Sequence, residues 1–193
     1  MLANTILQLN IVDLAIAILL VKICYTAVKT GLVTEAFKLL GTIAATYLAM
    51  HYFTALADLV RGGGVAKTVG LEFLDFLAFI VLAFLGYGFF LVARMAFARF
   101  IKVEAAPRLN RIGGLALGVV RGLIAGSLLV LMLFISSVSA ISDMARVSFF
   151  GTKIAKISFS LYNGMWRGFF SKVIPQERPN EIILGLQDSL TQK

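Results

Sequence analysis

The chain has 193 residues, of which 60% are hydrophobic and 15% charged, and its net charge at pH 7 is +8. Its mean hydropathy is +0.92. Soluble domains have about 45–50% apolar and about 25% charged residues, so this composition excludes an ordinary soluble domain and indicates an integral membrane protein. The single cysteine and the single histidine exclude an internal disulfide, a zinc cluster and a multi-histidine metal site.

Four apolar stretches are long enough to cross a bilayer as helices, which takes roughly 20 residues each. They cover about residues 11–28, 32–52, 73–93 and 112–138. We therefore predict an all-α membrane protein whose four-span transmembrane domain occupies residues 1–138.

The first two spans are separated by Lys29-Thr30-Gly31, which predicts a tight turn. Residues 53–72 predict a more polar connection that contains the flexible breaker Arg61-Gly62-Gly63-Gly64. These glycines do not form a phosphate loop, because no Lys-Ser/Thr follows them and no buried strand precedes them.

After the fourth span, residues 139–175 mix aromatic and aliphatic side chains with glycines and bases. This pattern predicts one or two amphipathic helices lying on the membrane, with Trp166 at headgroup depth and Lys153 and Lys156 facing away from the apolar set. Residues 176–193 are expected to be a polar tail, either a short soluble helix or disordered.

The distribution of bases predicts the topology. The connection between spans three and four carries Arg94, Arg99, Lys102, Arg108 and Arg111 against one acid, Glu104, and Lys22, Lys29 and Lys38 flank the first turn. Both regions are then cytoplasmic, which places the N-terminus and the C-terminus outside. The basic residues of the tail oppose this orientation, but the rule is weakest for long segments.

Glycines recur every four residues in the fourth span, at Gly114, Gly118, Gly122 and Gly126. Residues four apart share one helix face, so this glycine ridge lets another backbone approach closely in lipid. Together with Gly41, the ridge indicates either static packing within one bundle or a seam between subunits.

Arg121 is an intramembrane cation beside the ridge. A charge at the bilayer centre costs ~2.5–3.5 kcal/mol, so a partner or water is expected. Asp13, Glu35 and Asp75 are the candidate partners. The arginine indicates either a structural ion pair or a polar path for an ion or proton.

Other polar residues have simpler interpretations. Lys22 and Glu35 are placed to pair across the first turn, but the favoured interpretation is a basic anchor and a helix-start acid. His51 is expected in an interfacial aromatic girdle with Tyr52, and Cys24 in inert packing.

The sequence resembles the colicin V production protein family of small bacterial inner-membrane proteins. The similarity begins at Asn10 and Asp13, continues through Gly31-Leu32-Val33-Thr34-Glu35 and Leu40-Gly41, and is strongest over Leu109-Asn110-Arg111-Ile112-Gly113-Gly114 with Gly118, Arg121 and Gly122. The resemblance implies a place in the bacterial envelope and a need for the protein in the production or export of a peptide toxin. It implies no agreed biochemical activity.

These observations favour a non-enzymatic envelope factor that packs with itself or with a transport partner through the ridge, while its tail grips the outer leaflet. The alternative is a small oligomeric transporter or channel with Arg121, Asp13 and Glu35 along a polar path. An enzyme is disfavoured because no nucleophile and base converge in the pattern, and no motif implies a cofactor or a nucleic-acid partner. The lipid bilayer is the one certain partner of such a chain.

Overall fold

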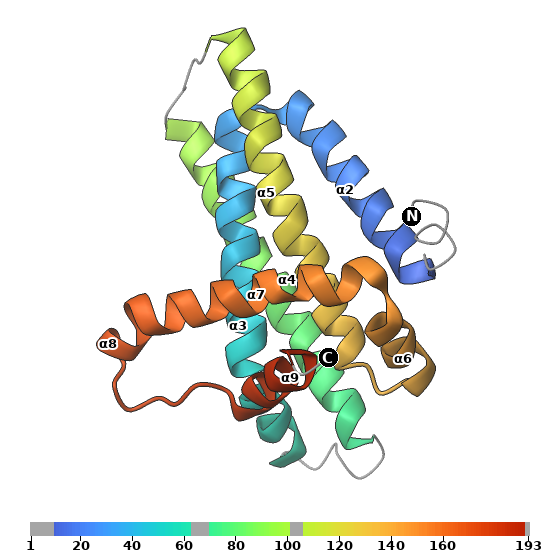
Figure 1. The fold of residues 1–193 in the computed structure, drawn as a ribbon. Coiled ribbons are helices and arrows are strands. Elements are labelled where there is room, and N and C mark those ends of the chain that lie inside the picture. The colour runs from blue at the N-terminus through green and yellow to red at the C-terminus, as the bar shows by residue number, and fades with distance from the viewer. Residues whose placement is uncertain (1–9, 63–69, 101–105, 192–193) are drawn as a thin grey trace.

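A computed structural model describes residues 10–62, 70–100 and 106–191, and all of its regular structure there is helical (Figure 1). This confirms the predicted all-α class. The helices in chain order are α2 (Ile11–Thr30), α3 (Leu32–Gly62), α4 (Leu71–Phe100), α5 (Pro107–Phe134), α6 (Ser139–Val147), α7 (Phe149–Met165), the π-helical turn η2 (Trp166–Phe170), α8 (Ser171–Val173) and α9 (Glu181–Thr191). Gly63, Gly64, Lys102 and Glu104 lie outside the described residues.

Four of the described helices, α2 to α5, are long and apolar enough to cross a membrane. Two of them exceed the spans expected from sequence. α3 continues ten residues past position 52 to Gly62, and α4 begins at Leu71, so most of the expected polar connection is helical. The extension is held by packing, because the buried Phe53 contacts Phe79 of α4 with ring centroids 5.9 Å apart.

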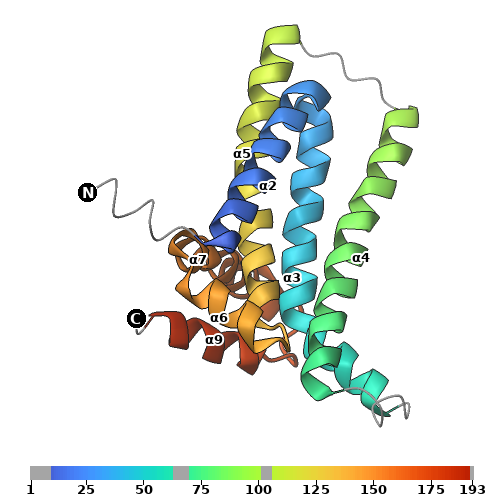
Figure 2. The same cartoon turned by 90° about the vertical axis from the view of Figure 1, so that its right-hand side faces the viewer.

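By their contacts the four long helices follow the order α2, α5, α3, α4, so α5 lies between α2 and α3. α4 stands at the edge of the bundle beside α3 (Figure 2). α2 packs mainly on α5, and α3 packs on both α5 and α4. α4 lies along α3 and barely touches α5. α3 and α5 are therefore the inner helices of the bundle, and α2 and α4 are peripheral.

The turn between α2 and α3 is fixed by Gly31, whose φ of 81° lies in the left-handed region that favours glycine. Asn110 of α5 covers this turn, since its side-chain oxygen accepts a hydrogen bond from the Leu32 amide at 2.7 Å. A Cβ on Gly31 would collide with the Asn110 side chain. The start of α3 is thus capped by a residue 78 positions away.

The region after α5 folds back onto the bundle. α7 crosses α3 and α5 at a steep angle in Figure 1. Its central turn is attached to Ser127 of α5, whose hydroxyl donates to the Ala155 carbonyl and accepts from the Ser158 amide at 2.9 Å. Residues 139–175 are therefore helical for most of their length, as expected, and also pack on the bundle. Their contact with the outer leaflet remains a prediction.

The last segment is more than a polar tail. α9 buries Ile183 and Leu190, and its Gln187 accepts a hydrogen bond from Asn163 of α7. Asn180 begins this helix, because its side-chain oxygen accepts from the amides of Ile182 and Ile183. Of the two expected states, a short helix and disorder, the structure has the helix.

Candidate functional site

The glycine ridge is occupied within the chain. A Cβ added to Gly114 would lie 2.7 Å from the Ala27 carbonyl oxygen, and one on Gly118 would collide with the Ala27 side chain. A Cβ on Gly122 would lie 2.9 Å from a Leu20 methyl group. All of these contacts are with α2, so the ridge serves packing within one bundle and is not free to form a seam between subunits.

Gly41 likewise packs inside the bundle, where a Cβ would lie 3.1 Å from Phe90 and 3.3 Å from Tyr87 of α4. Gly86 of α4 packs more tightly against α3 than Gly41 does against α4, and the sequence pattern did not single it out. A Cβ there would lie 2.7 Å from the Ala45 Cα. A single glycine without a repeat carries no spacing signal, so nothing in the sequence distinguished Gly86 from Gly88.

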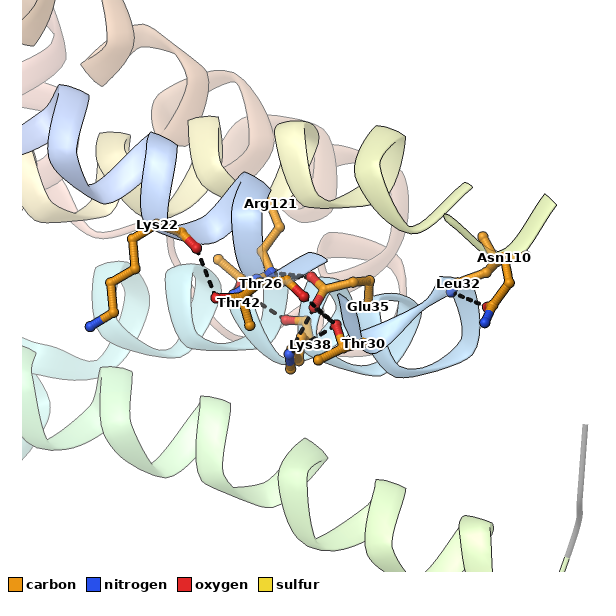
Figure 3. A network of polar contacts seen from close by, with 9 residues as sticks. All are labelled: Lys22, Thr26, Thr30, Leu32, Glu35, Lys38, Thr42, Asn110 and Arg121. Carbon is orange, nitrogen blue, oxygen red and sulfur yellow. Dashed lines mark hydrogen bonds and ion pairs between the residues drawn. The ribbon is translucent and has the colours of Figure 1, made fainter. Parts of the chain in front are cut away.

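Arg121 pairs with Glu35, one of its three candidate partners. The Arg121 Nε and Nη2 atoms both lie 2.8 Å from the same carboxylate oxygen of Glu35 (Figure 3). The other oxygen accepts from the Thr30 hydroxyl at 2.6 Å and from the Lys38 ammonium at 2.7 Å. Glu35 is fully buried, and its carboxylate is satisfied by two cations and one hydroxyl.

The other two candidate partners are engaged elsewhere. Asp75 forms an ion pair with Arg61 at 2.8 Å. Asp13 lies near the opposite end of α2, about 27 Å from Gly31 at the standard helix rise. It accepts hydrogen bonds from the Ser148 hydroxyl at 2.6 Å and from the Phe150 amide at 2.8 Å. Asp13 therefore lies apart from the Arg121–Glu35 pair, and a polar path that joins the three residues remains a prediction.

The sequence had allowed Lys22 to pair with Glu35. In the structure it does not, because Lys38 and Arg121 bind that carboxylate. It lines a groove of about 550 Å³ between α4 on one side and α2 and α5 on the other, with α3 as its floor. Lys38 and Arg121 line the same groove, and most of its other lining is apolar. The groove and its charged group, Lys22, Glu35, Lys38 and Arg121, form the candidate functional site.

The residues that build this site lie inside a recognised family pattern. The sequence matches the family model described as "Colicin V production protein" over residues 12–158. The chain belongs to this family. No curated protein and no solved structure matches it.

The match to the colicin V production family confirms the resemblance seen in the sequence and includes Asp13, the groove and the whole ridge. It ends at Ser158, within α7. The C-terminal half of α7 and everything after it thus lie beyond the matched region.

A second polar cluster in this colicin V production family member lies partly beyond that region. His51 is buried, and the rings of Tyr162 and Trp166 cover it; its place in an interfacial girdle remains a prediction. Its ring nitrogens lie 2.9 Å from the Tyr162 hydroxyl and 3.1 Å from a Glu177 oxygen. The backbone amide of Asn180 also donates a hydrogen bond to the Tyr162 hydroxyl, at 2.9 Å. This cluster attaches the tail to α3.

Burial raises the pKa of Tyr162, and the Glu177 carboxylate raises it further, while the hydrogen bond from the Asn180 amide works in the opposite direction. The phenol therefore stays neutral and donates or accepts within the cluster. Tyr162, Glu177 and Asn180 were missed because they share no spacing with His51. The one available signal was Asn180 followed by Glu181, which is typical of a helix start.

The expected membrane anchors have mixed surroundings. Lys153 and Lys156 are exposed on α7, whereas Trp166 is half-buried and stacks on His51 with ring centroids 5.1 Å apart. Cys24 is half-buried and unbridged. In this family member the tryptophan thus holds the tail to α3, and its depth in the headgroups remains a prediction.

Proposed function

We propose that this member of the colicin V production family is a non-enzymatic factor of the bacterial inner membrane. It supports toxin production and export, or envelope homeostasis, by contacting a helix of a membrane transport or secretion partner. Family membership and four helices of membrane length support this proposal. The family is not known as a family of enzymes.

The observation that carries the proposal is the position of α4. Only 17% of its apolar stretch is buried in the protein, against 50% for α3 and for α5. The ridge, which the sequence favoured as the contact, is already filled by α2. α2 is also sparsely buried, at 28%, and α4 is the least covered of the four long helices, so we assign the partner contact to its outer face.

Gly88 gives this face a local notch. No atom lies within 4 Å of the position a Cβ would take there. Phe84 and Val92, four residues before and after it, are exposed on the same side of the helix. A partner helix can approach the backbone at Gly88 between these two side chains, which is how helices associate closely in lipid.

Gly88→Leu tests the contact. In a host that secretes a peptide toxin and lacks its own family member, we expect the wild-type chain to restore secretion and Gly88→Leu to lose most of it. Gly185→Leu is the matched control, because Gly185 of α9 also has open space around it. Equal secretion by Gly88→Leu and wild type, at equal membrane levels, would refute the contact. Photocrosslinking from Val92 to a second copy of the chain would show that the α4 face binds the protein itself and not a transport partner.

The proposed topology, with both termini outside, has a separate test. Cys24→Ser removes the single cysteine, and Ser189→Cys places a new one on the exposed side of α9. An impermeant thiol reagent should label this variant in intact cells. Labelling only after lysis would reverse the orientation and place the tail in the cytoplasm.

The groove favours the second candidate, a small oligomeric transporter or channel. It brings Arg121, Glu35 and Lys38 together, but Asp13 is bound to α7 at the other end of α2. Flux into proteoliposomes that disappears in the Arg121→Leu/Glu35→Leu double variant, which removes one charge of each sign, would support a path through the groove. No flux above that of lipid-only vesicles would end this candidate.

A further inference from the structure

We propose that the groove between α4 and α2–α5 holds an anionic phospholipid of the surrounding bilayer. Its phosphate sits between Lys22 and Lys38, and one acyl chain lies along α4 and α5. This inference concerns the side of α4 that lines the groove. Phe84 lines the groove and also flanks Gly88, so the partner contact proposed above borders the groove at that residue.

The groove carries unbalanced positive charge. Lys22, Lys38 and Arg121 line it, and Glu35 is the carboxylate that pairs with the latter two. Three cations and one carboxylate leave a net charge of +2. An unpaired charge in hydrocarbon is costly, so the groove favours an anionic occupant.

Lys22 is the cation that most needs such an occupant. It is exposed, and no ion pair joins it to any carboxylate in residues 10–62, 70–100 and 106–191. Its backbone carbonyl accepts from Thr26, and its side chain extends away from the Glu35 network (Figure 3) and lines the groove. A lipid phosphate supplies the oxygen acceptors that an ammonium binds best.

The rest of the lining suits a hydrocarbon chain better than a polar solute. Ile80 and Phe84 on α4 face Leu128 and Leu129 on α5 across the groove. The Thr42 hydroxyl donates to the Lys38 carbonyl, as Thr26 does to Lys22, so both threonines already have partners. The volume of about 550 Å³ is typical of ligand sites. One end of the groove is cationic and the remainder is apolar. This matches a molecule that has an anionic headgroup and a hydrocarbon chain.

The depth of the lysines fits a headgroup at the membrane surface. Lys22 lies nine residues before Gly31 and Lys38 seven residues after it, so both are about 10–13 Å from the α2–α3 turn along their helices. The exposed Lys22 side chain points away from the turn in Figure 3, so binding a phosphate beside Lys38 requires it to rotate toward the predicted cytoplasmic surface, as lysine side chains do in membranes.

The test is native mass spectrometry of the full chain in detergent with added dioleoyl phosphatidylglycerol or dioleoyl phosphatidylcholine. We expect wild type to retain the anionic lipid about tenfold more tightly than the zwitterionic one, and Lys22→Gln to lose most of that preference. Lys22→Arg should keep it. Lys29→Gln is the matched control, because Lys29 lies at the end of the same helix and contacts Tyr25 instead of the groove.

Three outcomes would overturn the proposal: equal retention of both lipids by wild type, an unchanged preference in Lys22→Gln, or equal losses in Lys22→Gln and Lys29→Gln. Glycerol 3-phosphate separates a lipid from free phosphate. If it competes as well as phosphatidylglycerol does, the site binds a soluble phosphate and the lipid is wrong. Gly88→Leu should leave lipid retention unchanged, so failure of one proposal leaves the other standing.

Discussion

Two carboxylates are buried in the part of the chain that the structure describes, at opposite ends of the α2–α3 hairpin, and they are stabilised in different ways. Glu35, near the α2–α3 turn, is held by Arg121 and Lys38. Asp13, near the other end, is held by the Ser148 hydroxyl and by backbone amides at the start of α7. Cations neutralise the first charge, whereas a helix N-terminus offsets the second through its dipole and its free amides. The Glu35 site therefore tolerates the loss of a charged partner poorly, whereas the Asp13 site depends on the position at which α7 begins.

Arg121→Leu breaks the first arrangement and should have the largest effect. Removing one partner of a buried ion pair leaves the other charge uncompensated, which costs about 3–5 kcal/mol of stability. The measurement is unfolding by sodium dodecyl sulfate in mixed micelles. The Arg121→Leu/Glu35→Gln double variant should recover a substantial part of the loss. A double variant no more stable than Arg121→Leu would show that the pair itself is not the cause.

The ridge sharpens the same comparison, because its contacts are tightest at Gly118 and loosest at Gly126. A Cβ on Gly118 collides with Ala27, whereas one on Gly126 would lie at an ordinary 3.6 Å from Ile16. Gly118→Ala should cost about 3 kcal/mol, since helix backbones must separate. Gly126→Ala should be neutral or stabilising by up to about 1 kcal/mol, because alanine favours helix. Equal effects in the same micelle assay would contradict the packing gradient.

Asp13→Asn tests the second carboxylate. Asparagine keeps one acceptor for Ser148 or Phe150 but loses the charge, so we expect a cost of about 1–2 kcal/mol. The change should appear as faster hydrogen exchange in the first turn of α7, with the α2–α3 turn unaffected. Ser148→Ala, which removes the hydroxyl donor, should act in the same place. Protection of α7 equal to that of wild type would show that the carboxylate does not anchor this helix.

The smallest expected effect is an alkaline one at Tyr162. Its pKa is raised in the folded chain, so the folded state binds the phenolic proton more tightly than the unfolded state does. Stability from this group is complete below the unfolded pKa near 10 and falls as pH rises above it. Between pH 9 and pH 11 the loss in Tyr162→Phe should be smaller than in wild type, by less than about 1 kcal/mol. Identical pH profiles would assign the alkaline loss to other groups.

Much of the membrane domain could be predicted from local pattern. Apolar length identified the four helices, and four-residue spacing identified the ridge as a packing surface. Arg121 was recognised as needing a partner, but three acids remained because an arginine side chain reaches several ångströms in either direction. Which acid it meets depends on how α5 crosses α3, and hydropathy does not encode that.

The C-terminal region was harder because its contacts join distant parts of the chain. His51 contacts Tyr162, 111 residues later, and Asp13 contacts Ser148, 135 residues later. No periodicity relates such positions. The length of α3 was underestimated for a similar reason. Residues 53–62 are too polar to register as a span, but their helix is maintained by packing of Phe53 and Ala57 against neighbouring helices.

The separation of the ion-pair partners also has a consequence for synthesis. Glu35 leaves the ribosome 86 residues before Arg121. At elongation rates of about 5–20 residues per second, that interval is roughly 4–17 s. During it the first hairpin, α2–α3, waits in or beside the insertion machinery with its acid lacking the arginine. The hairpin therefore enters the bilayer as an unfinished unit, and α5, the helix that completes it, arrives last of the four.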